Sequence, residues 1–268
     1  LLKALAGSYS PLQVTALRGL VAMPLVCLYI GWRREFGAVF SRQLRWRLHL
    51  LRAVFSVSMM GLFTYGLKTL GLAEAYTLAF VAPLVVTMLA APVLGEIVLP
   101  RHWFAILTGL AGVVMALRPQ QGAFLSLGAL AVLAAAVLYA SSNIVGRLIS
   151  RTEPSVTLVF WTTASLALGG SILGAWQWVD IQREHGWILL GLAVTGFLGQ
   201  LAITEAFRQG QAAVVAAFEY SALAWAVGLD WLFWQTVPQF HTLIGGAVII
   251  ASGIVLIRRE RPATVIPA

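Results

Sequence analysis

Long apolar stretches separated by short polar connections fill the sequence from end to end. Each stretch is long enough, or nearly so, to cross about 30 Å of hydrocarbon as a helix. Runs such as 125–138 do not alternate between polar and apolar positions, which excludes a transmembrane β-barrel. The pattern therefore predicts an all-α membrane protein, a polytopic bundle of transmembrane helices. Its nine complete spans lie near 11–32, 50–67, 71–94, 102–117, 124–146, 155–178, 187–207, 212–234 and 240–257.

The two halves of the chain resemble one another. A shift of 139 to 143 residues, with small gaps, places Pro11 on Pro154 and Gly71 on Gly210. The same shift places residues 1–5 on 144–148, so the chain is expected to begin inside a tenth span. We therefore predict two five-helix repeats, residues 1–120 and 121–268, with the first helix truncated. Because five is odd, the second repeat must be inverted in the membrane.

The basic residues predict the orientation. With the truncated helix starting in the cytoplasm, 13 of the 18 Lys and Arg residues fall in cytoplasmic connections, four fall outside, and Arg18 stays within a span. Such a bias places both termini in the cytoplasm, and we expect the protein to lie in a bacterial plasma (inner) membrane. The inside set is Arg33, Arg34, Arg42, Arg45, Arg47, Arg52, Arg101, Arg147, Arg151, Arg208, Arg258, Arg259 and Arg261, and the outside set is Lys3, Lys68, Arg118 and Arg183.

Composition excludes several classes of protein. Apolar residues make up 60% of the 268 residues and charged residues 10%, with a mean hydropathy of +0.87, which excludes a soluble domain. The net charge of +8 sits mostly in connections between spans, so we expect no nucleic-acid partner. One cysteine, Cys27, allows no intrachain disulfide. Four His residues stand singly at span ends, so we expect no metal, no cofactor and no enzyme activity.

Short motifs mark both halves of the chain: Pro83, Gly95-Glu96 and Gly109-Leu-Ala-Gly112-Val-Val in the first, and Glu219-Tyr220, Trp225 and Gly253-Ile-Val-Leu in the second. Together these motifs resemble the EamA type of the drug/metabolite transporter superfamily. The second half departs from the usual pattern, since Tyr220 stands where a proline often follows the Glu, and Phe233-Trp234-Gln235 replaces a Gly-Glu ending. The resemblance implies two five-helix repeats and a gradient-driven carrier or exchanger of small metabolites, often amino acids, amines or drugs. It also implies a central cavity among the third, fourth, eighth and ninth helices.

Glu219 is the sharpest candidate for a functional group. A carboxylate within an apolar span is costly, so it needs a compensating role. In the functional interpretation, Glu219 binds a proton or the amino group of a cargo in turn and couples the two fluxes. In the structural alternative, it pairs with Arg18 or Arg208 and only holds two helices together.

Two polar stripes predict surfaces that face a cavity. Gln200 and Thr204 are four residues apart in one span, and Tyr139 and Asn143 repeat that spacing in another. Hydrogen bonding between helices is the alternative for both stripes. An aromatic box for a planar or cationic ligand is predicted from further residues of four spans. These residues are Tyr65, Tyr76, Thr77, Phe80, Trp161 and Tyr220.

Prolines and glycines suggest where helices bend and pack. Pro24 and Pro83 interrupt apolar spans, and the kinks they favour serve either as gates or as ordinary packing features. Gly109, Gly112 and Gly245 form small-residue faces that fit either internal packing or a homodimer.

Inverted repeats of helices are the usual plan of secondary transporters. The sequence therefore predicts a carrier that moves a small zwitterionic or cationic metabolite through the lipid bilayer by alternating access. A membrane-embedded structural or receptor protein without transport activity is the alternative. Because the spans hold no cluster of Lys and Arg, we do not expect sugar phosphates as cargo. The sequence does not indicate the direction of transport.

Overall fold

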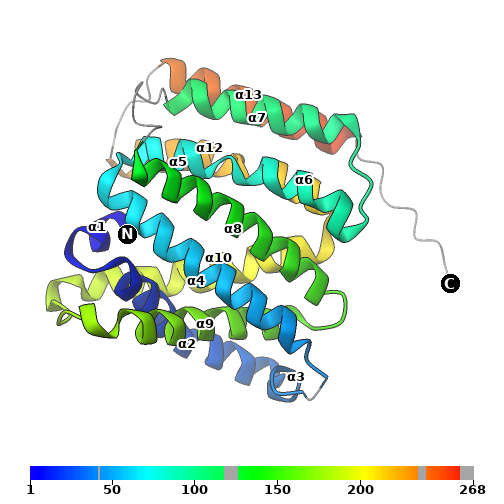
Figure 1. The fold of residues 1–268 in the computed structure, drawn as a ribbon. Helices are drawn as coiled ribbons and strands as arrows, with labels where there is room; N and C mark the ends of the chain where they lie inside the picture. Colours follow the sequence, from blue (N-terminus) through cyan, green and yellow to red (C-terminus); the bar gives the residue numbers. More distant parts are fainter. Residues whose placement is uncertain (42, 118–125, 235–239, 260–268) are drawn as a thin grey trace.

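A computed structural model describes residues 1–41, 43–117, 126–234 and 240–259, and within these ranges it contains no strand. Figure 1 shows the long helices stacked in one bundle with their ends at two opposite sides. Arg42, Arg118 and Arg261, three of the counted charges, lie outside the described residues. The α-helices are α1 (Leu2–Ser8), α2 (Pro11–Arg33), α3 (Phe36–Val39), α4 (Trp46–Thr69), α5 (Leu72–Ala79), α6 (Ala82–Leu94), α7 (Pro100–Leu117), α8 (Leu127–Ile149), α9 (Ser155–Gly174), α10 (Gly186–Gln209), α11 (Ala212–Glu219), α12 (Ser221–Trp234) and α13 (Phe240–Arg259), with short 3₁₀ turns η2 (Ala175–Gln177) and η3 (Arg183–His185).

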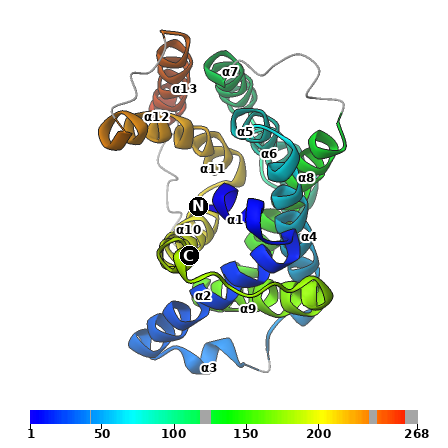
Figure 2. The same ribbon diagram turned by 90° about the vertical axis from the view of Figure 1, so that its left-hand side faces the viewer.

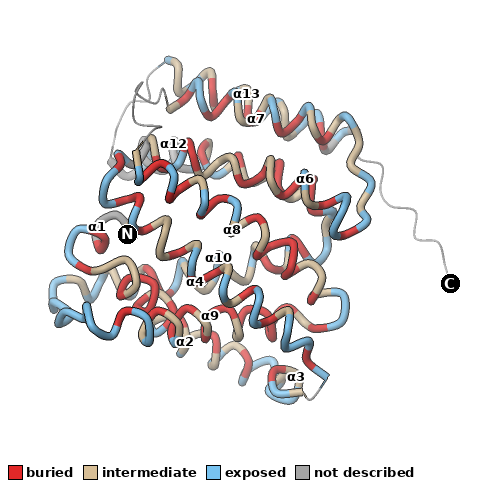
Figure 3. Tube along the Cα trace, viewed as in Figure 1, coloured by how far each residue is buried: buried red, intermediate tan, exposed pale blue. Residues whose placement is uncertain are grey.

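The predicted spans correspond to helices. Seven helical stretches are long and apolar enough to cross a membrane, and Ala212–Trp225 and Phe240–Leu256 are shorter apolar helices. Large apolar side chains remain on the outer faces, for example Leu28 at 72% and Ile172 at 68% exposed. Figure 3 shows the buried residues where helices face one another. Lipid can cover the outer faces, so the fold is an all-α polytopic membrane bundle.

Two of the spans are broken where the sequence predicted continuous helices. Span 71–94 consists of α5 and α6 with the break at Phe80 and Val81, and span 212–234 consists of α11 and α12 with the break at Tyr220. The 139- to 143-residue shift between the halves places these breaks at corresponding positions. Hydropathy could not reveal them, because both parts of each span are apolar.

The backbone turns tightly at both breaks. Pro83 lies in the first turn of α6 and has no N–H to donate to the preceding turn, which explains the first break. Leu84 N donates to Val81 O at 3.0 Å, and Leu223 N donates to Tyr220 O at 3.1 Å, each across three residues rather than four. Pro24, in contrast, lies inside α2, which continues on both sides of it.

Helices from the two halves of the chain pack in pairs. Contacts join α2 to α9, α4 to α8, and α7 to α13, and Figure 2 shows the first and last of these pairs at opposite ends of the molecule. A Cβ at Gly19 would lie 2.8 Å from Thr163 O, and one at Gly112 would lie 2.9 Å from Gly245 O. The α2–α9 and α7–α13 backbones therefore approach closely, and these glycines serve internal packing.

The connections after α2 and α9 each contact a helix of the other half. Trp161 Nε1 of α9 donates to Val39 O at 3.0 Å. In return, Gln13 of α2 exchanges two hydrogen bonds with the Val179 backbone, at 2.5 and 3.1 Å. These contacts fix α2 and α9 together and anchor one wall of the site described next.

Candidate functional site

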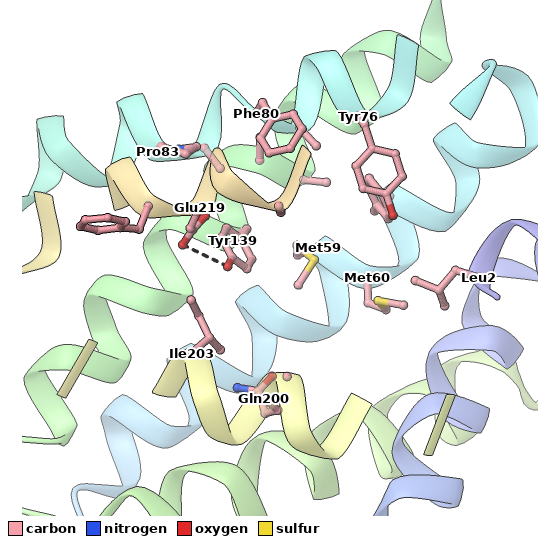
Figure 4. Close-up of a pocket in the computed structure, with 18 of the residues that line it drawn as sticks. Leu2, Met59, Met60, Tyr76, Phe80, Pro83, Tyr139, Gln200, Ile203 and Glu219 are labelled. Atoms are coloured by element: carbon pink, nitrogen blue, oxygen red, sulfur yellow. Dashed lines mark hydrogen bonds between the residues drawn. The ribbon is translucent and has the colours of Figure 1, made fainter. Parts of the chain in front are cut away.

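A cavity of about 600 Å³ lies among the helices, a volume in the range of small-molecule sites (Figure 4). Most of its lining is apolar or aromatic, and the side chains come from both halves of the chain. Arg18 and Glu219 are the charged residues among the described lining residues. The lining comprises Leu2, Arg18, Met59, Met60, Phe63, Tyr76, Ala79, Phe80, Ala82, Pro83, Ala135, Ala136, Tyr139, Gly199, Gln200, Ile203, Phe218, Glu219, Ser221, Ala222 and Trp225.

Both broken helices reach this cavity at their breaks. Phe80 and Pro83 flank the α5–α6 break, and Glu219 and Ser221 flank the α11–α12 break, and all four line the cavity. Across the breaks, the rings of Phe80 and Tyr220 lie 5.8 Å apart. Irregular backbone at membrane depth is tolerated where it is buried in protein or lines a cavity. Paired breaks of this kind are also where transporters place their substrate sites.

Glu219 is held at the break by a hydrogen bond. It is the last residue of α11, and Tyr139 Oη of α8 donates to its Oε1 at 3.2 Å (Figure 4). Burial among apolar side chains penalises a charged carboxylate, and a phenolic donor offsets part of that penalty. A carboxylate in this setting can accept a proton or bind a cationic group.

The structure brings six of the predicted site residues into the cavity lining. These six are Tyr76, Phe80, Pro83, Tyr139, Gln200 and Glu219.

Three further predicted residues are buried beside the lining rather than in it. Thr77, Asn143 and Thr204 are 5%, 7% and 5% exposed. Gln200 Nε2 donates to Thr204 Oγ1 at 3.2 Å, which orients the Gln200 amide from behind. Thr204 is thus placed to support a cavity residue.

The structure places the other three predicted aromatic residues outside the cavity lining. Trp161 packs against Phe40, Trp46 and Phe160 and bonds to Val39 O, away from the cavity lining. Tyr65 is 40% exposed on α4.

Tyr220 faces α7 instead of the cavity. It is 1% exposed, and a Cβ at Gly109 would lie 2.5 Å from its Cδ2. The sequence does not indicate which face of a helix such a residue occupies, because the face depends on which neighbours the helix meets.

The described side chains do not form the ion pair with Arg18 or Arg208 that the structural alternative for Glu219 requires. Arg208 pairs with Glu205 at 3.5 Å, and no ion pair between described residues joins Arg18 to Glu219. The cavity lining also includes Arg18, Met59, Met60 and Trp225, which were not predicted as site residues. A signal for Arg18 was present, since it is a cation left inside a span. Within the described ranges, no three His, Cys, Asp or Glu residues gather as a metal site would require.

Comparison with known proteins identifies the family. The sequence profile of the EamA-like transporter family matches residues 1–118 and 126–259. The chain is 28% identical over 266 residues to a pseudopaline exporter of Pseudomonas aeruginosa, covering 97% of this chain and 91% of that protein. It is 28% identical to a riboflavin transporter of Vibrio cholerae, over 87% of this chain and 78% of that protein. An S-adenosylmethionine uptake transporter of Rickettsia conorii is 24% identical, over 81% of this chain and 73% of that protein.

A crystal structure with 21% sequence identity has the same fold, with a TM-score of 0.79 over 96% of this chain and 92% of that chain. The family and the relatives named above are transporters and not enzymes. The protein is therefore an integral membrane transporter, and the chain belongs to the EamA-like transporter family.

Proposed function

We propose that this protein is a gradient-driven carrier that moves a small amphipathic metabolite, such as an amino acid, an amine or a drug, by alternating access. The observation that carries the proposal is the Glu219–Tyr139 pair, which lies in a largely apolar cavity where both broken helices meet. In this proposal the protein lies in a bacterial plasma membrane with both termini in the cytoplasm.

Glu219 supplies the coupling in this proposal. Its carboxylate binds either a proton or the cationic group of a cargo, and occupation by one excludes the other. Such competition couples two fluxes when the loaded and empty forms prefer different sides of the membrane. The breaks next to Glu219 and Pro83 supply points where the helices can bend during that change.

The relatives support the amphipathic character of the cargo. Riboflavin and S-adenosylmethionine, named for two of them, both carry a heteroaromatic ring. Tyr76, Phe80 and Trp225 offer aromatic surface in the cavity for such a group. The pseudopaline exporter, which covers 97% of this chain, supports export as the direction.

The experiment measures flux in liposomes that contain the purified protein, as a function of pH, for a panel of amino acids, amines and aromatic metabolites. Wild-type protein should carry at least one of them against its concentration gradient when a proton gradient is imposed. Glu219→Gln should bind less cargo and lose most of the pH dependence. Glu205→Gln is the matched control, because Glu205 has partners of its own in Ser155 and Arg208, outside the cavity lining.

Two results would contradict the proposal. Absence of any substrate-dependent flux for the whole panel would favour the receptor or structural alternative. An unaltered pH profile in Glu219→Gln, together with a lowered thermal stability, would mean that Glu219 only holds helices together.

A further inference from the structure

Arg18 is a charged side chain in an otherwise apolar part of α2. It lies seven residues after the first residue of the helix, Pro11, and lines the cavity. An arginine side chain stays protonated in proteins and carries five N–H donors. A permanent charge inside a span is costly unless an acceptor or a ligand compensates for it.

Among the residues that the structure describes, Arg18 has only a weak acceptor. The one hydrogen bond that its guanidinium makes to another described residue goes from Nη1 to Met60 Sδ, at 3.5 Å. A thioether sulfur is neutral and accepts hydrogen bonds weakly. None of the ion pairs among the described residues includes Arg18. Its charge-assisted donors are therefore left for something that enters the cavity.

Arg18 and Glu219 act on the same cavity from separate positions. Met60, which accepts the hydrogen bond from Arg18, lies at a different place along the cavity from Glu219 (Figure 4). Tyr139 lies beside Glu219. Tyr139 lies within electrostatic range of both charges. The cavity thus presents one cation and one anion that do not neutralise each other directly.

We propose that Arg18 binds a carboxylate of the cargo, so that the transported class is a zwitterion whose cationic group lies at Glu219. This inference rests on the proposed transport function and deepens it. A zwitterion compensates both cavity charges at once. An amine without a carboxylate leaves Arg18 uncompensated, and a multiply charged phosphate is repelled by Glu219.

The planar guanidinium also matches the chemistry of the anion. It can donate two parallel hydrogen bonds to one carboxylate, which an ammonium group cannot reproduce. Arg18→Lys should therefore keep the charge and lose part of the affinity. The neighbouring apolar wall, with Met59 and Phe63, suits the uncharged part of such a molecule.

The test uses three probes that share a phenyl ring: L-phenylalanine, phenethylamine without the carboxylate, and 3-phenylpropionate without the amine. Binding to the purified full-length protein is measured by thermal shift and by competition with a transported substrate. Wild-type protein should bind L-phenylalanine at least tenfold more tightly than either partial probe. Arg18→Gln should lose at least tenfold in affinity for L-phenylalanine and little for phenethylamine. Arg47→Gln, at an exposed position at the start of α4, is the matched control.

Arg18→Lys keeps the test decisive if Arg18→Gln does not fold, since its preference for L-phenylalanine over phenethylamine should be weaker than that of both wild-type protein and Arg47→Gln. The inference is overturned if wild-type protein binds phenethylamine as well as L-phenylalanine, or if it binds none of the three probes. It is also overturned if the Arg18 variants lower affinity for both amine-containing probes equally. Failure of the transport proposal has a different signature, namely carboxylate-selective binding without any flux.

Discussion

The hydroxyl of Tyr139 is the group that the structure places on Glu219, at 3.2 Å from Oε1. Hydrogen bonds to charged partners contribute about 1.5–3 kcal/mol, roughly twice the value for neutral partners. Since Tyr139 comes from α8 and Glu219 from α11, the bond also fixes the C-terminal end of α11 relative to the cavity. Removal of the hydroxyl should change both the charge state and the position of Glu219.

Tyr139→Phe should therefore lower the rate of cargo uptake into liposomes by about tenfold or more, because about 1.4 kcal/mol corresponds to a factor of ten. The ring remains, so the protein should fold and insert normally. Tyr65→Phe is the control, because Tyr65 is 40% exposed and lies outside the cavity lining. Equal uptake rates for both variants at matched protein levels would show that the Tyr139 hydroxyl has no role in transport.

The presence of polar and aromatic residues within the spans could be recognised from the sequence, whereas their orientation about the helix axis could not. Glu219 and Gln200 were predicted in the cavity because a polar group in an apolar span needs a partner, and the structure places both in the lining. Trp161 and Tyr220 were also predicted to lie in the cavity, but they pack against neighbouring elements. The two groups of residues differ in their rotation about the helix axis. Tertiary packing sets this rotation, and hydropathy does not report it.

At the scale of helices, the breaks at Val81 and Tyr220 are the features most closely connected to the cavity. Pro83→Ala restores an N–H to the first turn of α6 and allows α5 and α6 to join. The substitution should slow turnover more than it weakens binding of the cargo, because it stiffens the segment and leaves the lining nearly unchanged. Initial rates of exchange at saturating cargo, compared with binding affinity, provide the measurement.

Pro24→Ala is the comparison for this prediction, since Pro24 lies within a continuous helix and outside the cavity lining. If both proline variants slow exchange to the same extent, the α5–α6 break has no special role in the conformational change.

Close contact between α2 and α9 should decide the stability of the bundle. A Cβ at Gly19 would lie 2.8 Å from Thr163 O and would force the two helices apart. Gly19→Ala should destabilise the protein by about 1–3 kcal/mol, the usual cost of overpacking. Gly246→Ala is the control, because its Cβ would have no neighbour within 4 Å and it has the same gain in helix propensity. Thermal unfolding in detergent should separate the two variants, and equal melting temperatures would contradict close packing.

At the scale of the whole molecule, the positions of the nine spans could be predicted from hydropathy alone. Span 155–178 contains α9, Ser155–Gly174, and span 187–207 contains nearly all of α10, Gly186–Gln209. The pairing of helices could not be predicted, because in a bilayer all outer faces are apolar and hydropathy does not distinguish lipid from protein as a neighbour. Close glycine contacts, such as that of Gly19 with α9, determine which helices pair.

The remaining prediction concerns the inversion of the two halves. The connection after α2 is bound by Trp161 of α9, and the connection after α9 is bound by Gln13 of α2. In an inverted pair, these two connections must lie on opposite sides of the membrane. The Arg-rich connection after α2 should be cytoplasmic, since positive charge is retained on that side.

Single cysteines can test this prediction, because Cys27 is the only cysteine in the sequence and can be replaced by Ser. Gln43 and Gln177 are a matched pair, both exposed glutamines in the connections after α2 and α9. In intact cells with a permeabilised outer membrane, an impermeant maleimide should label Gln177→Cys and not Gln43→Cys. Inside-out vesicles should give the reverse result. Labelling of both positions from one side would rule out inversion, whereas a complete exchange of the pattern would keep the inversion and place the termini outside the cytoplasm.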